Sequence, residues 1–217
     1  MDQRVAGLYA ITPDSADTTG LLARVEAALA GGARLLQYRN KEASPALRLV
    51  QGRALLALCW EYQVPLIIND HLDLALALDA HGLHIGGEDG FPAEARKRLG
   101  PEKILGVSCY GRIENALPAA DAGATYVAFG GFFPSSVKPG PARTPIGLLG
   151  EAKRTLKVPV VAIGGITLEN APQLIKAGAD SVAVISGLFA ASDVKLAAQR
   201  FSGLFPRRQR KPAAGKR

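Results

Sequence analysis

Eight short apolar runs recur along this 217-residue chain, and their spacing constrains the fold more than any other feature. Each run holds five to seven residues, is rich in Val, Ile, Leu or Tyr, and is continuous rather than alternating. Strands that are buried on both faces of a parallel sheet have this pattern. The runs lie at residues 7–12, 34–39, 65–70, 82–86, 103–108, 126–132, 159–165 and 181–186.

Most segments between these runs have helical character. Between the second and third runs, apolar residues recur at intervals of three and four and predict one apolar helix face, formed by Leu47, Val50, Ala54, Leu58 and Tyr62. Glycine-containing tripeptides precede the second, sixth and eighth runs and predict helix ends, at GGA (31–33), AGA (122–124) and AGA (177–179).

Eight strands with intervening helices predict a single α/β domain over residues 1–205, a (β/α)8 TIM barrel. A doubly wound open sheet is the alternative. Eight repeats within this length, with no Gly-x-Gly-x-x-Gly after the first strand, favour the barrel. Apolar residues make up 48% of the chain, which is enough for a large core.

The formal net charge of +7 resides mainly in the last twelve residues, PRRQRKPAAGKR (206–217). This basic tail holds six of the 26 basic residues and no acidic residue, so the rest of the chain has a net charge of +1. We expect the tail to be disordered and to aid solubility. It is the one segment whose charge suits RNA, DNA or anionic lipid, and we expect no nucleic-acid binding by the barrel.

The chain carries no sign of membrane insertion or export. No apolar run approaches the ~20 residues that span a bilayer, and the N-terminus, MDQRVAGLYAIT, does not resemble a signal peptide. Two cysteines, Cys59 and Cys109, form no disulfide framework. We therefore expect a cytoplasmic protein with reduced thiols.

In such a barrel, the carboxyl ends of all strands meet on one face, where the site is built. The second strand ends in Gln37-Tyr38-Arg39-Asn40-Lys41. Side chains alternate along a strand, so Gln37, Arg39 and Lys41 are predicted to point the same way. An amide followed by two cations suits a polar ring and an anion, although a solvated strand end has the same composition.

Two carboxylates follow neighbouring strands. Asn69-Asp70 ends the third strand, and Asp89 comes after the fourth. Because neighbouring strands lie about 4.8 Å apart, the carboxylates can approach each other, and a divalent cation would relieve their repulsion. We therefore predict a Mg²⁺ site at Asp70 and Asp89. The alternative is that Asp70 caps the helix that begins near His71.

The remaining strand ends are rich in small and hydroxyl residues. Ser108 ends the fifth strand, and the segment GGFFPSSVKPG (130–140) offers two hydroxyls and Lys138. Gly164-Gly165 and Ser186-Gly187 end the seventh and eighth strands, the usual position of a phosphate site in these barrels. The pattern predicts one pocket for a diphosphate and one for a monophosphate. The histidines at 71, 81 and 84 are interpreted as structural or solvated.

These motifs resemble the thiamine-phosphate synthase family, in order from about residue 7 to 193. They are Gln37-x-Arg39-x-Lys41, IIND with Asp70, HIGGED with Asp89, Gly106-Val107-Ser108, FFPSSVK with Lys138, AIGGIT (162–167) and AVIS (183–186). The resemblance implies an enzyme that joins hydroxymethylpyrimidine diphosphate to thiazole phosphate, with release of pyrophosphate and formation of thiamine monophosphate.

The resemblance also implies roles for individual residues. The catalytic cations would be Arg39, Lys41 and Lys138. The pyrimidine diphosphate would contact Gln37, Tyr38, Arg39, Asn40, Lys41, Asn69, Ser108 and Lys138. The thiazole phosphate site would be lined by Ser135, Ser136, Val137, Gly165, Ile185 and Ser186. Asp70 and Asp89 would bind Mg²⁺ as the cofactor.

Two residues depart from the family pattern, which commonly has Gln at Gly87 and Thr at Val137. The competing functions are a thiazole phosphate tautomerase and a non-catalytic regulatory paralogue on the same barrel. The complete diphosphate-binding set favours the synthase over both. The expected partners are the two small substrates; a homo-oligomer is compatible with the sequence, which does not determine the oligomeric state.

Overall fold

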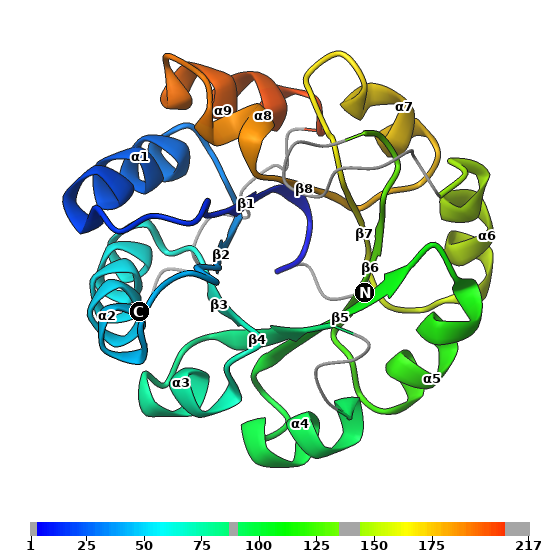
Figure 1. The fold of residues 1–217 in the computed structure, drawn as a ribbon. Helices are drawn as coiled ribbons and strands as arrows, with labels where there is room; N and C mark the ends of the chain where they lie inside the picture. The colour runs from blue at the N-terminus through cyan, green and yellow to red at the C-terminus, as the bar shows by residue number, and fades with distance from the viewer. Residues whose placement is uncertain (1–3, 87–90, 135–143, 207–217) are drawn as a thin grey trace, which may run out of the picture.

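The computed structural model describes residues 4–86, 91–134 and 144–206 of the chain. Within them, eight parallel strands form a closed barrel in sequence order, so the predicted (β/α)8 barrel is confirmed (Figure 1). The strands are β1 (Gly7–Ile11), β2 (Leu35–Tyr38), β3 (Leu66–Asn69), β4 (Gly82–Ile85), β5 (Ile104–Tyr110), β6 (Tyr126–Gly130), β7 (Val160–Ile163) and β8 (Ser181–Val184).

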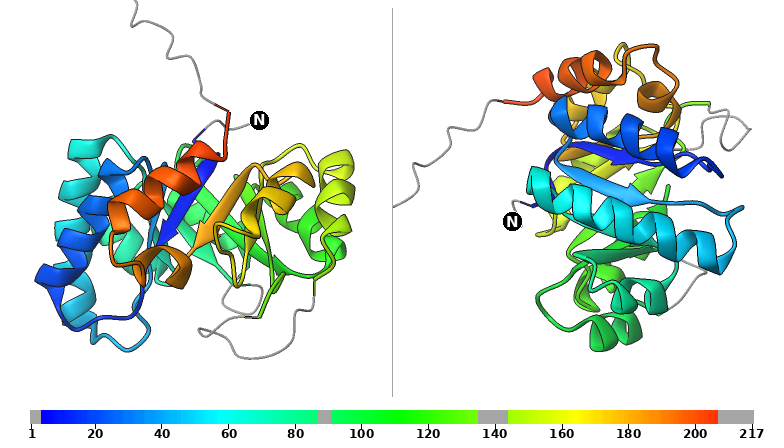
Figure 2. Two further views of the ribbon diagram at one scale, coloured as in Figure 1. Left: turned by 90° about the horizontal axis from the view of Figure 1, so that it is seen from above. Right: turned by 90° about the vertical axis from the view of Figure 1, so that its left-hand side faces the viewer.

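Helices surround the barrel and follow the strands along the chain (Figure 1). They are α1 (Thr18–Ala30), α2 (Pro45–Tyr62), α3 (Leu72–Ala77), α4 (Pro92–Leu99), η1 (Ile113–Asn115), α5 (Ala116–Asp121), α6 (Gly147–Thr155), α7 (Ala171–Lys176), α8 (Ser186–Phe189) and α9 (Val194–Gly203). Figure 2 shows α9 lying beside α1, where the last part of the described chain covers the first. Some of these helices are short, since α3 has six residues.

The barrel closes where the first strand pairs with the last. Tyr9 on β1 is in register with Leu35 on β2 and with Ala183 on β8. Side chains alternate along each strand, so one set points into the barrel and the other toward the helices. This alternation divides the buried residues into two cores.

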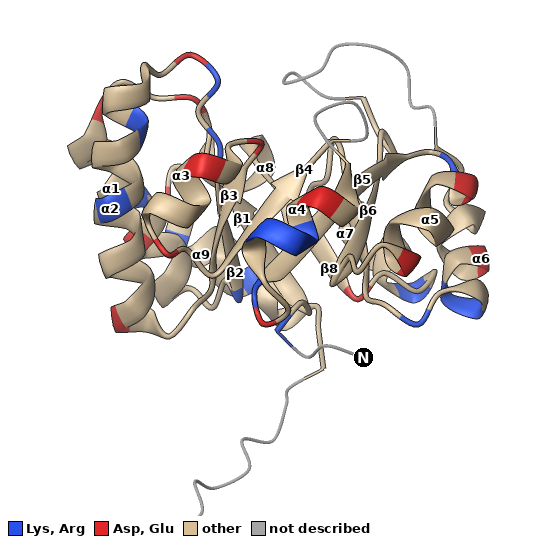
Figure 3. Ribbon diagram, turned by 90° about the horizontal axis from the view of Figure 1, so that it is seen from below, with Lys and Arg blue, Asp and Glu red and all other residues tan. Residues whose placement is uncertain are grey.

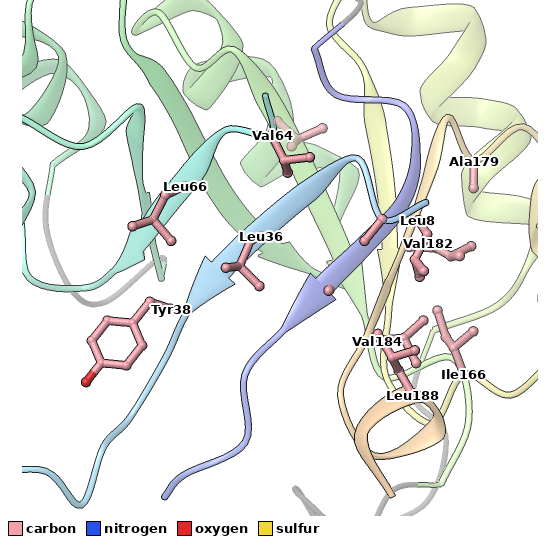
Figure 4. Close-up of a cluster of buried hydrophobic side chains, with 14 of the residues drawn as sticks. Leu8, Leu36, Tyr38, Val64, Leu66, Ile166, Ala179, Val182, Val184 and Leu188 are labelled. Carbon is pink, nitrogen blue, oxygen red and sulfur yellow. The ribbon is translucent and has the colours of Figure 1, made fainter. Parts of the chain in front are cut away.

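The inner core fills the barrel itself and is made of Val5, Tyr9, Ile11, Leu35, Ile67, Ile104, Tyr126, Ala128, Val161 and Ala183. The outer core lies between the strands and the helices and is the larger of the two. Figure 4 shows part of it, with Leu8, Leu36 and Leu66 on the outer side of their strands. Because strands are buried on both sides, their sequences are continuous apolar runs rather than alternating ones.

The predicted helix ends are confirmed at all three glycine tripeptides. α1 ends at Ala30, α5 at Asp121 and α7 at Lys176, each one residue before its tripeptide. The middle residue of each tripeptide is a glycine, at positions 32, 123 and 178, and its positive φ turns the chain toward the next strand.

The predicted apolar face of α2 is wrong by about one residue. The helix buries Gln51, Gly52, Leu55 and Cys59, whereas Val50 is 58% exposed. The buried Gln51 side chain accepts hydrogen bonds from Tyr38, the last residue of β2, and from Asn40, which follows it. Gln51 therefore faces inward, and this sets the rotation of the helix. Leu58 and Tyr62, from the predicted face, are only partly buried on its flank.

The carboxyl ends of the strands face the upper edge in Figure 3, and charged residues lie there as well as on the outer helices. α9 runs toward the opposite face, and the described chain ends at Pro206. Residues 207–217 of the predicted basic tail lie outside the described residues. No helix in the described ranges combines the length and apolar character needed to cross a membrane.

Packing of α9 against α1 predicts a large difference between two apolar positions on α9. Phe201 is fully buried and Leu196 is 51% exposed. Phe201→Ala should lower the free energy of unfolding by about 3–5 kcal/mol because it opens a cavity. Leu196→Ala is the matched control and should change it by about 0.5 kcal/mol or less. Urea denaturation measures both, and equal effects would show that α9 is not part of the folded core.

Candidate active site

The strand end after β2 is held by residues that follow β1. The Arg39 guanidinium donates to the Asp14 carboxylate, with Nη1 and Oδ2 2.8 Å apart. The other Asp14 oxygen accepts from the backbone N–H of Lys41. The buried Thr12 hydroxyl accepts from the Arg39 N–H at 2.9 Å and donates to the Arg39 carbonyl at 2.8 Å. One short segment after β1, which contains Thr12 and Asp14, therefore fixes the backbone that carries both predicted cations.

Tyr38 and Asn40 alternate with these residues and lie on the helix side. The Tyr38 hydroxyl donates to Oε1 of Gln51 at 2.8 Å, and Asn40 Nδ2 donates to the same oxygen at 3.0 Å and to the Ser15 carbonyl at 2.7 Å. Figure 4 shows Tyr38 among the outer-core side chains. Burial raises the pKa of Tyr38 to about 12. Both residues position the strand end through contacts within the protein.

Gln37 and Ser108 are joined through the interior of the barrel. Gln37 Nε2 donates to the Tyr9 hydroxyl at 2.8 Å, and the Tyr9 and Tyr126 hydroxyls are 2.8 Å apart. Tyr126 Oη lies 2.9 Å from Nδ1 of His84, whose Nε2 lies 2.9 Å from the Ser108 hydroxyl. Five side chains from five strands thus form one hydrogen-bonded chain.

These interior groups are neutral near neutral pH. Burial lowers the pKa of His84 to about 4 and raises the pKa values of Tyr9 and Tyr126 well above their ordinary range.

The strand β5 has a register shift between Ser108 and Tyr110, directly after the serine. Such irregularities are common beside active sites, where they re-aim a side chain.

The segment after β3 presents Asp70 in an unusual backbone conformation. Its φ is +61°, its N–H donates to the His84 carbonyl at 2.8 Å, and Asn69 Nδ2 donates to Asp70 Oδ2 at 2.6 Å. A positive φ is uncommon outside glycine, and Asp is one of the residues that adopt it most readily. α3 begins at Leu72 with His71 at its N-cap, so the alternative role of Asp70 as the cap is not what the structure shows.

Only one of the two predicted metal ligands, Asp70, lies within the described residues. Its carboxylate is a hard donor of the kind that Mg²⁺ prefers. Asp89, the second predicted ligand, lies outside the described residues. In the described part of the chain, no cluster of three or more His, Cys, Asp or Glu side chains has the geometry to hold a metal ion.

A pocket lies between the ends of β7 and β8 and the start of α8, lined by Ile163, Gly164, Gly165, Ile166, Ala183, Ile185, Ser186 and Gly187. The three residues predicted there, Gly165, Ile185 and Ser186, are therefore brought together. Asn170 Nδ2 donates to the Gly165 carbonyl at 2.9 Å and fixes one wall. The other predicted residues of this site, Ser135, Ser136 and Val137, lie outside the described residues, as does Lys138.

Sequence reasoning missed several residues that shape the site. Thr12 and Asp14 were not singled out, and His84 was interpreted only as structural or solvated. The sequence contained part of the information. Side chains alternate along β4, so His84 lies on the same side of the strand as Gly82, and that side points into the barrel. Tyr9 and Tyr126 were assigned only to strands. The partners of these side chains depend on which strands face each other across the barrel.

A TIM barrel with cations after β2, and with a pocket of glycines, Ser186 and apolar residues at the ends of β7 and β8, has the arrangement that is common among phosphate-binding barrel enzymes. The family described as Thiamine monophosphate synthase matches residues 8–188 of this chain. The chain therefore belongs to that family, and the predicted resemblance is confirmed.

Individual relatives agree with this assignment. The chain is 54% identical over 202 residues to the thiamine-phosphate synthase of Nitrosomonas eutropha, covering 93% of this chain and 95% of the relative. It is 55% identical over 201 residues to that of Methylobacillus flagellatus, covering 93% and 96%. The solved thiamine phosphate pyrophosphorylase from Pyrococcus furiosus matches with a TM-score of 0.82 and 34% identity, covering 94% of this chain and 97% of the other.

The wall of the pocket predicts a steric test at Gly165. Its φ is +62°, and an added Cβ would lie 2.2 Å from the Pro134 carbonyl oxygen. Gly165→Ala should therefore lower the free energy of unfolding by about 1–3 kcal/mol. Gly147, in α6, has open space around it, so Gly147→Ala is the control and should be neutral or stabilising. Chemical denaturation compares them, and a neutral Gly165→Ala would contradict the described wall.

Proposed function

We propose that this chain joins hydroxymethylpyrimidine diphosphate to thiazole phosphate and releases pyrophosphate and thiamine monophosphate. The observation that carries the proposal is that Arg39 and Lys41, which follow β2, and the pocket between β7 and β8 lie at the carboxyl ends of parallel strands and so on one barrel face. Family membership over residues 8–188 supports the same reaction. A diphosphate and a monophosphate would occupy separate parts of this face.

The reaction would proceed by departure of the diphosphate. The bond between the methylene carbon and the diphosphate oxygen breaks, and its electron pair leaves with pyrophosphate. The aminopyrimidine ring stabilises the resulting cation, and the thiazole nitrogen donates its lone pair to the methylene carbon. Arg39, Lys41 and Lys138 would act as the catalytic groups by neutralising the leaving group, since such stabilisation is usually the largest catalytic contribution.

This chemistry needs no protein nucleophile, and the described residues fit that requirement. Both cysteines are buried, and burial raises each thiol pKa to about 12. A thiol in that state is a poor nucleophile near neutral pH. The neutral hydrogen-bonded interior suits binding of an uncharged ring better than proton abstraction.

Asp70 and Asp89 would hold Mg²⁺, and Mg²⁺, when bound, would add positive charge beside the diphosphate. Asn69 supports this role because its amide fixes the Asp70 carboxylate. The thiazole phosphate would bind at Gly165, Ile185 and Ser186, with Ser135, Ser136 and Val137 contributing hydroxyl and backbone donors. Gln37 and Ser108 would contact the pyrimidine.

The direct test is incubation of the protein with both substrates and Mg²⁺, followed by detection of thiamine phosphate and pyrophosphate. We expect both products in equal amounts.

Lys138→Ala should lower kcat by about two orders of magnitude or more, because its charge would act on the departing diphosphate. Lys176→Ala, on the outer helix α7, is the control and should keep kcat. Binding of thiazole phosphate without condensation would instead favour a tautomerase or a regulatory paralogue.

The metal assignment predicts a specific change in Mg²⁺ dependence. EDTA should abolish turnover, and Asp89→Asn should raise the Mg²⁺ concentration needed for half-maximal rate, because one carboxylate ligand is lost. The KM for thiazole phosphate should change little. Steady-state rates across a Mg²⁺ titration measure both effects, and full activity of Asp89→Asn without added metal would contradict the assignment.

A further inference from the structure

The hydrogen-bonded chain from Gln37 to Ser108 has a donor direction that can be worked out from its members. Each hydroxyl has one hydrogen to donate, and a neutral imidazole has one N–H and one accepting nitrogen. Both ring nitrogens of His84 are paired with hydroxyls, and burial favours its neutral form. Every link therefore has one donor and one acceptor, and the links constrain one another.

Only two arrangements both satisfy every link in this chain and use the hydrogen of each tyrosine hydroxyl within it. In the first, hydrogens point from Gln37 through Tyr9 and Tyr126 to Nδ1 of His84, and His84 Nε2–H donates to Ser108. In the second, every hydrogen points the other way, and Gln37 must present its amide oxygen to Tyr9. A mixed arrangement would leave a buried hydroxyl hydrogen without an acceptor in the chain, which is costly.

The orientation of Gln37 selects the first arrangement, because its Nε2 donates to the Tyr9 hydroxyl at 2.8 Å. His84 is then the Nε2–H tautomer. The two ends of the chain then have opposite chemistry. Gln37 offers its amide oxygen as an acceptor, and Ser108 offers its hydroxyl hydrogen as a donor.

A glycine on β5, Gly106, leaves the space that this hydrogen-bonded chain needs. Gly106 is in register with His84 on one side and with Tyr126 on the other. A Cβ at Gly106 would lie 2.3 Å from the Tyr126 hydroxyl and 2.5 Å from His84 Nδ1. Any other residue would therefore occupy the place where these two groups meet. The rings of His84 and Tyr126 also stack, with centroids 5.6 Å apart.

We propose that Tyr9, Tyr126 and His84 are positioning residues that fix Gln37 as an acceptor and Ser108 as a donor toward the pyrimidine. The inference rests on the proposed function for the identity of that ring. An exocyclic amino group donates, so it would pair with the Gln37 oxygen. A carbonyl at the same ring position accepts, and it would face that oxygen without a hydrogen between them. The chain is thus a determinant of specificity for the amino over the oxo pyrimidine.

The tautomer of His84 tests the chain without any substrate. Nitrogen NMR of protein labelled at histidine distinguishes a protonated from an unprotonated ring nitrogen, and loss of the signal in His84→Gln assigns it. We expect Nε2 protonated and Nδ1 bare in the wild-type protein near neutral pH. A protonated Nδ1 with a bare Nε2 would reverse the chain and overturn the proposal.

Substrate preference tests the functional consequence. The measured quantity is the ratio of kcat/KM for the pyrimidine diphosphate to that for its oxo analogue. Tyr126→Phe removes the middle hydroxyl, so Tyr9 becomes free to donate to Gln37 and the amide can turn. We expect the ratio to fall by about tenfold, the contribution of one such hydrogen bond. An unchanged ratio would overturn the proposal.

Tyr62→Phe is the matched control, because the Tyr62 hydroxyl donates to Glu26 on the outside of the barrel. It should leave the ratio unchanged. Tyr9→Phe cuts the same chain at its next link and serves if Tyr126→Phe does not fold; if neither folds, the wild-type tautomer decides. A wild-type protein that does not turn over the amino substrate would contradict the proposed function, whereas the NMR result would still decide the direction of the chain.

Discussion

The pairing of β1 with both β2 and β8 is the constraint on which the rest of the structure depends. It closes the sheet, so no strand edge remains within the barrel and every strand is buried on two sides. Closure also fixes which side chains point inward, because alternation along each strand is then set by register. Tyr9, Gln37, His84, Ser108 and Tyr126 meet only because that register holds around the whole circle.

The polar interior is unusual for a barrel otherwise filled with aliphatic side chains. Burying hydroxyl, amide and imidazole groups is costly unless each has a partner. Here each group is hydrogen-bonded to the next, from Gln37 at one end of the chain to Ser108 at the other. The interior thus serves both as a packed core and as support for the site above it. The same logic applies outside the barrel, where Gln51 on α2 holds Tyr38 and Asn40.

Much of this architecture could be predicted from the sequence because the strands and helix ends depend on short runs of neighbouring residues. Continuous apolar runs indicate doubly buried strands, and their ends place Arg39, Asp70 and Ser186 on one face of the barrel. The face of α2 could not be predicted, since it depends on the buried Gln51. Thr12 and Asp14 were missed because their partners follow β2, and His84 because its partners are on β5 and β6. These contacts join residues that are 24 to 42 positions apart in the sequence, and the strand register brings them together.

A crystal structure of the protein with thiamine phosphate, pyrophosphate and Mg²⁺ tests the central claim most directly. The account predicts the phosphate of thiamine phosphate at Gly165 and Ser186, pyrophosphate beside Arg39, and the pyrimidine amino group against the Gln37 amide oxygen. Ligands bound on the opposite face of the barrel, or a pyrimidine turned away from Gln37 and Ser108, would contradict it.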